Sequence, residues 1–269
     1  MKDKQRVDVA LVERGLTESR EKAQRAIMAG TVYIGQQKVL KPSETVSAEQ
    51  ELTVRGAAIP WASRGGLKLE KALRSFAVDP AGMVCMDIGA ATGGFTDVLL
   101  TNGASHVYAI DVGYGQFDWR LRNDPRVTLM ERTNARFLTA DLVPLHPKLT
   151  VMDVSFISIK LILPVAASIM GDGGCFCTLI KPQFEAGRER LGKKGVVRDP
   201  RVHEDVLREI AGFPESFGWH TEALDYSPIT GPEGNIEFLA CIRPGLSDAV
   251  SGEFITDLVR RAHEDLKRN

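Results

Sequence analysis

Residues 86–100 read MDIGAATGGFTDVLL, an apolar run that turns on three glycines and resumes as an amphipathic stretch. The apolar start predicts a buried strand, and the stretch from Phe95 onward predicts a helix. Gly89, Gly93 and Gly94 let the backbone turn tightly between the two and come close to a ligand. A strand, a glycine turn and a helix in this order are typical of an α/β domain that binds a nucleoside-containing ligand at the turn.

Apolar, strand-like runs recur along the rest of the chain and alternate with helical patterns. They lie at residues 84–89, 106–112, 127–131, 149–154, 175–181, about 220–227 and 236–243, and the tail from 251 predicts a closing helix. Such alternation predicts a doubly wound, Rossmann-like α/β sheet, mostly parallel, with helices on both faces.

The first 60 residues have a different pattern. Residues 5–14 and 19–29 predict two short helices, and residues 31–40 and 51–56 predict short strands. We therefore expect a small α+β domain over residues 1–58, a linker over 59–64 that contains Pro60, and the α/β domain over 65–269. A length of 269 residues accommodates both.

The composition is that of an ordinary globular protein, with 43% hydrophobic and 26% charged residues and a formal net charge of −1. Basic charge is local: residues 1–41 hold nine Lys/Arg against five Asp/Glu, and residues 181–201 hold seven against three. Two basic patches on a neutral chain indicate a nucleic-acid footprint.

The cysteines and the N-terminal residues predict a protein of a reducing compartment. The four cysteines lie in apolar runs without paired CxxC spacing, so we expect reduced core thiols and no metal site: Cys85, Cys175, Cys177 and Cys241. No apolar run approaches the ~18 residues of a membrane span, and the N-terminus lacks the apolar core of a signal peptide. We expect a cytoplasmic protein.

The spacing of the glycine turn limits the cofactor. It lacks the G-x-G-x-x-G of dinucleotide enzymes and the G-K-[ST] of phosphate loops, which disfavours NAD and ATP. Asp111 ends the second strand about 20 residues on, where a carboxylate can bind a ribose diol. This pattern is typical of S-adenosylmethionine methyltransferases. The predicted cofactor-binding residues are Asp87, Gly89, Ala90, Thr92, Gly93, Gly94, Phe95, Asp111, Asn134 and Asp153.

Charged side chains gather at the carboxyl ends of the predicted strands, where α/β sheets bind ligands. Asp153 closes the fourth strand and Lys181 the fifth. Lys68, on the helix before the first strand, and Glu237, at the start of the last strand, reach the same crevice if that strand runs antiparallel. The segment DVSFIS stands where amino methylases carry [DN]-P-P-[FYW], which disfavours methylation of a base amine. A carbon-5 pyrimidine methylase needs a nucleophilic cysteine beside the cofactor, whereas Cys175 and Cys177 lie at the start of their strand, away from the ligand end of the sheet.

The set Lys68, Asp153, Lys181, Glu237 resembles the K-D-K-E set of the FtsJ-like ribose 2′-O-methyltransferases. More closely, the chain resembles the TlyA family, which joins an RNA-binding domain of the alpha-L type to that methyltransferase. The motifs that carry the resemblance are SREKAQRAIMAGTVYIG, SRGGLKLEKAL, DIGAATGGFTD, DVSFIS, KPQFEAGRE and GNIEFL, and they cover essentially the whole chain. One departure is the linker Ile59-Pro60-Trp61-Ala62, which keeps only the tryptophan of an R-x-W-V tetrapeptide.

The resemblance implies a mostly parallel sheet with an antiparallel last strand, S-adenosylmethionine as cofactor, and 2′-O-methylation of cytidine in ribosomal RNA of the large and, in some members, the small subunit. We expect Lys181 to be the base, oriented by Asp153 and Lys68, with Glu237 holding the network. The expected RNA contacts are Arg6, Arg14, Arg20, Lys22, Arg25, Arg64, Arg188, Lys193, Lys194 and Arg198.

Two alternatives stay open at this point. Relatives named haemolysins suggest a membrane-active protein, although the best apolar candidate, ILPVAASIMG, is too short to span a bilayer. The second alternative is a non-catalytic RNA-binding assembly factor. For such a protein we would expect an incomplete K-D-K-E set, whereas all four residue types are present in order.

Overall fold

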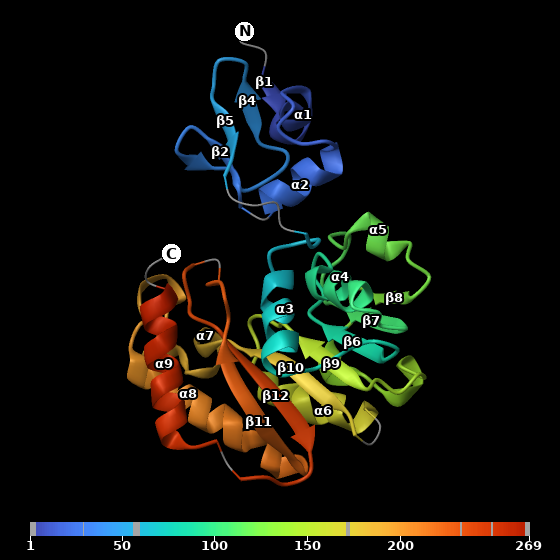
Figure 1. Ribbon diagram of the computed structural model, residues 1–269, viewed down its shortest axis with the longest axis vertical. Helices are drawn as coiled ribbons and strands as arrows, with labels where there is room; N and C mark the ends of the chain where they lie inside the picture. The colour runs from blue at the N-terminus through green and yellow to red at the C-terminus, as the bar shows by residue number, and fades with distance from the viewer. Residues whose placement is uncertain are drawn as a thin grey trace. The chain divides into compact units, whose positions relative to one another are not determined.

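The computed structural model describes residues 4–28, 30–55, 60–170, 173–231, 233–248 and 250–266. By its internal contacts the chain divides into two compact units, Met1–Gly65 and Gly66–Asn269 (Figure 1). The expected end of the first domain at Ala58 and the first linker residue, Ile59, lie outside the described residues.

The first unit packs two helices against short strands. Its elements are β1 Lys4–Arg6, α1 Val7–Glu13, α2 Arg20–Met28, β2 Val32–Ile34, β3 Gln37–Lys38, β4 Thr45–Ser47 and β5 Leu52–Val54. The Ser19 hydroxyl accepts a hydrogen bond from the Lys22 amide and so caps α2. The core residues are Val7, Ala10, Leu11, Ala23, Ile27, Val32, Val39, Val46 and Leu52.

Two strands of this unit were not predicted. Residues 5 and 6 were expected to be helical, but Gln5 and Arg6 lie in β1, which pairs antiparallel with β4. Each strand has three residues, too few for an alternating pattern, and Lys4 pairs with Ser47 far along the chain. Pairing at that separation leaves no local signal.

The second unit is an α/β domain. Its elements are α3 Gly66–Ser75, β6 Val84–Ile88, α4 Gly94–Thr101, β7 His106–Ile110, α5 Trp119–Arg122, β8 Val127–Met130, η1 Ala135–Phe137, η2 Ala140–Leu142, β9 Leu149–Met152, η3 Ile159–Leu161, α6 Leu163–Ile169, β10 Cys175–Ile180, α7 Pro182–Glu185, η4 Arg188–Arg190, η5 Lys193–Gly195, α8 Pro200–Gly212, η6 Phe213–Phe217, β11 Trp219–Tyr226, β12 Phe238–Pro244 and α9 Gly252–Leu266. All seven strands expected from the sequence are present.

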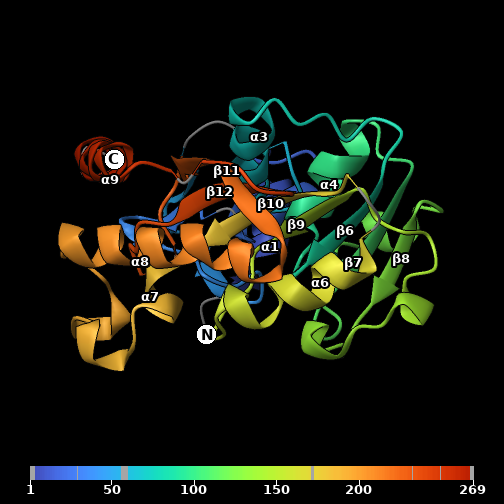
Figure 2. The same ribbon diagram turned by 90° about the horizontal axis from the view of Figure 1, so that it is seen from below.

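The seven strands form one sheet in the order β11-β12-β10-β9-β6-β7-β8. Pairing is parallel from β10 through β8, whereas β12 runs antiparallel to both β10 and β11. Figure 2 shows α3 and α4 over one face and α6 and α8 over the other. The central strands β9 and β10 are buried on both faces, which explains their continuous apolar runs, such as Cys175–Ile180.

The sheet direction brings distant residues to one edge. Asp153 directly follows β9, and Lys181 directly follows β10. Because β12 is antiparallel to β10, its first residue, Phe238, pairs with Ile180 at the end of β10. Glu237, just before β12, therefore reaches the same edge as Asp153 and Lys181.

Two structural findings bear on the alternatives. None of the helices within the described residues is long and apolar enough to cross a bilayer. Within the ILPVAASIMG segment, Leu163–Ile169 form α6, which buries Leu163, Ala166 and Ile169 in the core. The four cysteines are free and buried.

Candidate active site

Four side chains from separate parts of the second unit form a chain of alternating charges. Lys68 Nζ lies 2.7 Å from Glu237 Oε2 and 3.1 Å from Asp153 Oδ2. Lys181 Nζ lies 2.6 Å from the other oxygen of Asp153, Oδ1. The side chains of Lys68, Lys181 and Glu237 are at most a tenth exposed. We refer to Lys68, Asp153, Lys181 and Glu237 as the tetrad.

Lys68 and Asp153 keep their charges although little of either side chain is exposed. Burial opposes the charge on Lys68, yet the carboxylates of Asp153 and Glu237 outweigh it and raise the pKa of Lys68. Burial likewise would raise the pKa of Asp153, but the ammonium groups of Lys68 and Lys181 hold that pKa below its ordinary value. Lys68 is therefore a fixed cation, and Asp153 is a carboxylate shared by two lysines.

A pocket of about 540 Å³ opens next to Asp153 at the carboxyl ends of β6, β7 and β9. It contains four of the predicted cofactor residues, Gly89, Asp111, Asn134 and Asp153, and several that the sequence did not indicate: Ala91, Gly113, Gln116, Thr133 and Phe156. The predicted residues Asp87, Ala90, Thr92, Gly93, Gly94 and Phe95 are not among those that line it. These six belong to the end of β6, the turn and the start of α4.

Gly89 has to be glycine for two reasons. Its φ is +86°, which L-residues rarely adopt. A Cβ atom there would lie 2.7 Å from the carbonyl oxygen of Asp153. The glycine turn thus lies in contact with the backbone of a tetrad residue, which joins the pocket to the tetrad.

Asp111 lines the pocket and accepts hydrogen bonds from two backbone amides. Its Oδ2 accepts from the Ala91 amide at 2.8 Å, and its Oδ1 accepts from the Gly113 amide at 2.6 Å. Each carboxylate oxygen can accept a further hydrogen bond, so the residue stays able to bind hydroxyl groups. Ala91 has φ +48°, an unusual conformation for alanine, and no sequence signal marks this position.

Asp87 is a structural acid behind the turn and not part of the pocket wall. It is fully buried, and its Oδ2 accepts from the Thr96 hydroxyl at 2.7 Å, while Oδ1 has no hydrogen-bond partner. Burial, with smaller contributions from Asp153 and Asp111, raises the pKa of Asp87 to about 7. Its side chain is enclosed in this structure, and the cofactor contact that the sequence pattern predicted stays a prediction.

The segment after Asp153 is fastened to α7, the helix that follows Lys181. Lys181 Nζ donates to the Ser155 hydroxyl at 2.9 Å. Glu185 accepts from the Ser158 hydroxyl at 2.5 Å and from the Ile159 amide at 2.9 Å. The sequence pattern gave no role to these serines or to Glu185.

Phe156 is the most exposed large apolar side chain of that segment. It is 91% exposed, has φ +65° and borders the pocket. Its ring packs against that of Phe184 in α7, with 5.2 Å between the two ring centres. An exposed aromatic ring held in a strained backbone conformation indicates a binding surface.

Several basic side chains predicted to bind RNA also hold the first unit together. Arg6 and Arg20 each place Nε 2.9 Å from an oxygen of Asp8, whose side chain is fully buried. Arg14 donates to the backbone oxygens of Ser47 and Gln50. Their guanidinium groups remain partly exposed, so internal pairing and RNA contact are compatible.

The remaining predicted basic residues are distributed over both units. Lys22 pairs with Glu18, Arg25 is half-buried on α2, and Arg64 is half-buried near the end of the first unit. In the second unit, the exposed residues are Arg188, Lys194 and Arg198, while Lys193 is the first residue of η5. Buried Asn235 accepts from the Val197 amide and donates to the Gly195 carbonyl, which ties this segment to the residues just before Glu237.

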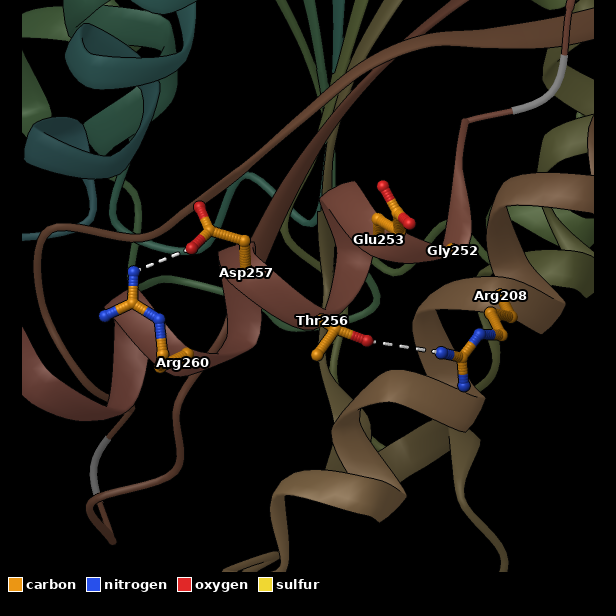
Figure 3. A pocket seen from close by; sticks show the side chains of 6 residues that line it. All are labelled: Arg208, Gly252, Glu253, Thr256, Asp257 and Arg260. Carbon is orange, nitrogen blue, oxygen red and sulfur yellow. Dashed lines mark hydrogen bonds and ion pairs between the residues drawn. The ribbon is translucent and has the colours of Figure 1, made fainter.

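A second hollow lies between α8 and α9 (Figure 3). Its two arginines already have partners: Arg208 donates to Thr256 and Glu204, and Arg260 pairs with Asp257. With its cations paired internally, this groove shows no feature that selects a ligand.

Comparison with known proteins agrees with the geometry. Residues 61–244, more than half of the chain, match the FtsJ-like methyltransferase family. The chain belongs to this family. Residues 5–52 match the S4 domain, so the predicted RNA-binding module of this FtsJ-like methyltransferase is an S4 domain. The predicted α/β methyltransferase fold with an antiparallel last strand is confirmed.

Similar proteins align over nearly the whole FtsJ-like chain. YqxC of Bacillus subtilis is 51% identical over 98% of this chain and 96% of its own. The 16S/23S rRNA (cytidine-2′-O)-methyltransferase TlyA of Mycobacterium tuberculosis is 44% identical over 96% of each chain. A Streptococcus thermophilus protein solved under the name haemolysin has a TM-score of 0.79 and 45% identity, and the match covers 100% of this chain and 99% of that one.

Proposed function

We propose that this methyltransferase transfers a methyl group from S-adenosylmethionine to the ribose 2′-hydroxyl of a cytidine in ribosomal RNA. The single observation that carries the proposal is the tetrad, whose Asp153 lines a pocket suited to a nucleoside-containing cofactor. The relative named TlyA acts on cytidine of 16S and 23S rRNA. We therefore assign large-subunit rRNA as substrate, small-subunit rRNA as a second candidate, and the cytoplasm as the place of action.

The pocket residues fit the cofactor. Gly89 leaves room that a Cβ atom would fill, Asp111 offers carboxylate oxygens for a ribose diol, and Asn134 offers an amide for an adenine. The cofactor, when bound, supplies a methyl group already activated on a sulfonium. The protein's contribution is then position, charge and the removal of one proton.

The tetrad can supply that proton acceptor. A 2′-hydroxyl is a weak nucleophile at neutral pH, because its proton is held tightly. We assign Lys181 as the base, which accepts this proton at Nζ when that amine is neutral. Asp153 and Ser155 hold Nζ in place, and Lys68 holds Asp153 from the other side, with Glu237 fixing Lys68.

The surface beside the pocket suits RNA with unstacked nucleotides. The guanidinium of Arg132 lies 4.2 Å from the ring centre of Tyr114, and that of Arg136 lies 5.5 Å from the ring centre of Phe137. Both aromatic rings are about two-thirds exposed, and Phe156 borders the pocket itself. Exposed aromatic rings with arginines are the groups on which proteins stack single-stranded bases.

The proposal is tested by mapping 2′-O-methylation on ribosomal RNA. RNA from cells with the gene, without it, and with the gene carrying Asp153→Ala should differ at cytidine positions, which are modified only with the unaltered gene. Identical methylation maps in all three would contradict the proposal. Modification that persists with Asp153→Ala would remove the tetrad from the mechanism.

The membrane-active alternative needs its own assay, since a homologous structure has the haemolysin name. Purified protein added to dye-loaded liposomes should release no dye at concentrations that saturate methyl transfer. Dye release that survives Asp153→Ala would establish a separate membrane activity.

A further inference from the structure

Three of the four cysteines form a cluster far from the tetrad. Cys175 and Cys177 lie two residues apart on β10, and therefore on the same face of the sheet. Cys241 on β12 is the cross-strand partner of Cys177, and its Sγ lies 3.6 Å from Sγ of Cys175. We call Cys175, Cys177 and Cys241 the thiol cluster. Cys175 is the first residue of β10 and lies about 20 Å along the strand from Lys181, which follows its other end.

The contacts within the cluster shift the pKa values of the Cys175 and Cys241 thiols in opposite directions. Hydrogen bonds from Cys177 and Cys241, together with the charge of Arg243, lower the pKa of the Cys175 thiol. The contact with Cys175 raises the pKa of the Cys241 thiol to about 11. A low-pKa sulfur in contact with a second thiol is the arrangement of an attacking and a resolving cysteine.

The cluster lies close to solvent on one side. Cys175 is 5% exposed, the most of the three. The Cys241 thiol contacts Glu222 at 3.3 Å, and Glu222 pairs with Arg243 at 2.5 Å. Both of these charged side chains are more than a third exposed. In the described part of the chain, no group of three or more ligands is arranged to hold a metal ion.

We propose that the thiol cluster is a site of reversible oxidation, at which a small peroxide converts Cys175 and Cys241 into a disulfide. The Cys175 thiolate attacks one peroxide oxygen, the O–O bond breaks, and hydroxide leaves a sulfenic acid on Cys175. The sulfur of Cys241 then attacks Sγ of Cys175, the S–S bond forms, and the S–O bond breaks. The sulfenic hydroxyl and the proton of the Cys241 thiol leave as water.

The two oxidation steps balance in atoms and electrons. Two thiol sulfurs give up two electrons, and one peroxide is reduced to one water and one hydroxide. The two sulfur atoms have to approach from 3.6 Å to about 2.05 Å, a shift of roughly 1.5 Å. A dithiol reductant reverses the reaction. The proposal is independent of the methyl-transfer function, because it involves no tetrad residue.

The test uses the full-length folded protein treated with hydrogen peroxide. Free thiols are then alkylated under denaturing conditions, and the protein is digested with chymotrypsin, which can cleave after Phe176 and so separate Cys175 from Cys177. Mass spectrometry should find a Cys175–Cys241 cross-link that a reductant removes, while Cys85 remains alkylated. Cys85 is the matched control, since it is buried on β6 and its sulfur contacts only the Met83 carbonyl among the hydrogen bonds described.

Variants separate the two roles. In Cys241→Ala, peroxide should stop at a sulfenic acid on Cys175 that dimedone traps, whereas Cys175→Ala should give neither product. Cys177→Ala and Cys85→Ala should keep the cross-link. Cys175 and Cys241 that remain as alkylatable as Cys85 after peroxide would overturn the proposal, and so would a cross-link between Cys177 and Cys241 in its place.

Discussion

Gly89 lies so close to Asp153 that a Cβ atom on the glycine would be 2.7 Å from the aspartate's carbonyl oxygen. The turn that borders the pocket and the strand end that carries the tetrad carboxylate are therefore one packed unit. A change at Gly89 should affect both cofactor binding and the tetrad.

We predict that Gly89→Ala lowers the affinity for S-adenosylmethionine by at least about tenfold, because both the left-handed backbone and the clash with Asp153 oppose a side chain there. Isothermal calorimetry measures this affinity. Gly218→Ala is the control: Gly218 has φ +80° but no atom within 4 Å of a Cβ. Equal affinities in the two variants would contradict the role of the contact.

A second prediction concerns the pH dependence of stability. The pKa of Asp87 is about 7 in the folded protein, against about 3.9 in the unfolded chain. Its protonated form is therefore favoured by folding. The stabilisation is fully present below about pH 4 and is lost as the pH rises through about 7, a change on the order of 4 kcal/mol.

Asp87→Asn should remove this dependence, since the amide stays neutral and can still accept from Thr96. Urea unfolding of the cofactor-free protein at about pH 5 and about pH 8 should give a smaller stability difference for Asp87→Asn than for the unaltered protein. An unchanged pH dependence would show that Asp87 is already ionised at neutral pH.

A third prediction concerns the acceptor side of the pocket. Glu185→Ala removes two hydrogen bonds that hold the segment from Ser155 to Ile159, which carries Phe156. We expect kcat/KM for RNA to fall about tenfold, while cofactor affinity is unchanged. Methyl-transfer kinetics over a range of RNA concentrations provides the measurement.

Glu189→Ala, in the exposed segment that follows, is the matched control. It should behave like the unaltered protein. If Glu185→Ala weakened cofactor binding as strongly as RNA methylation, Glu185 would have a general structural role and not one in presenting Phe156.

Much of the fold could be predicted because its signals are local. Most strands of the seven-stranded sheet are apolar runs, and the residue types at the strand ends were sufficient to predict that Asp153, Lys181 and Glu237 lie at one edge. The three-residue strands β1 and β4 could not be predicted, since they exist only through pairing with each other.

The site was predictable by residue type but not by contact. The pattern assigned Asp87 to the cofactor, but it gave no sign that the buried carboxyl group accepts a hydrogen bond from Thr96 of α4. Conversely, Ala91 contributes a backbone amide to Asp111, and Glu185 contributes through a segment about 26 residues earlier in the chain. Such contacts depend on backbone geometry and on packing between elements, for which sequence spacing gives no signal.

The central claim is that Lys181 accepts the proton of the 2′-hydroxyl. It is tested most directly by single-turnover methyl transfer from tritiated cofactor to ribosomal RNA, comparing Lys181→Ala and Lys181→Arg with the unaltered protein. We predict that both variants bind cofactor and RNA nearly normally and that both are slower by ~10²–10⁴-fold, because a guanidinium stays protonated and cannot act as the base. A near-normal rate for Lys181→Arg would contradict the claim and would reduce Lys181 to a fixed positive charge beside Asp153.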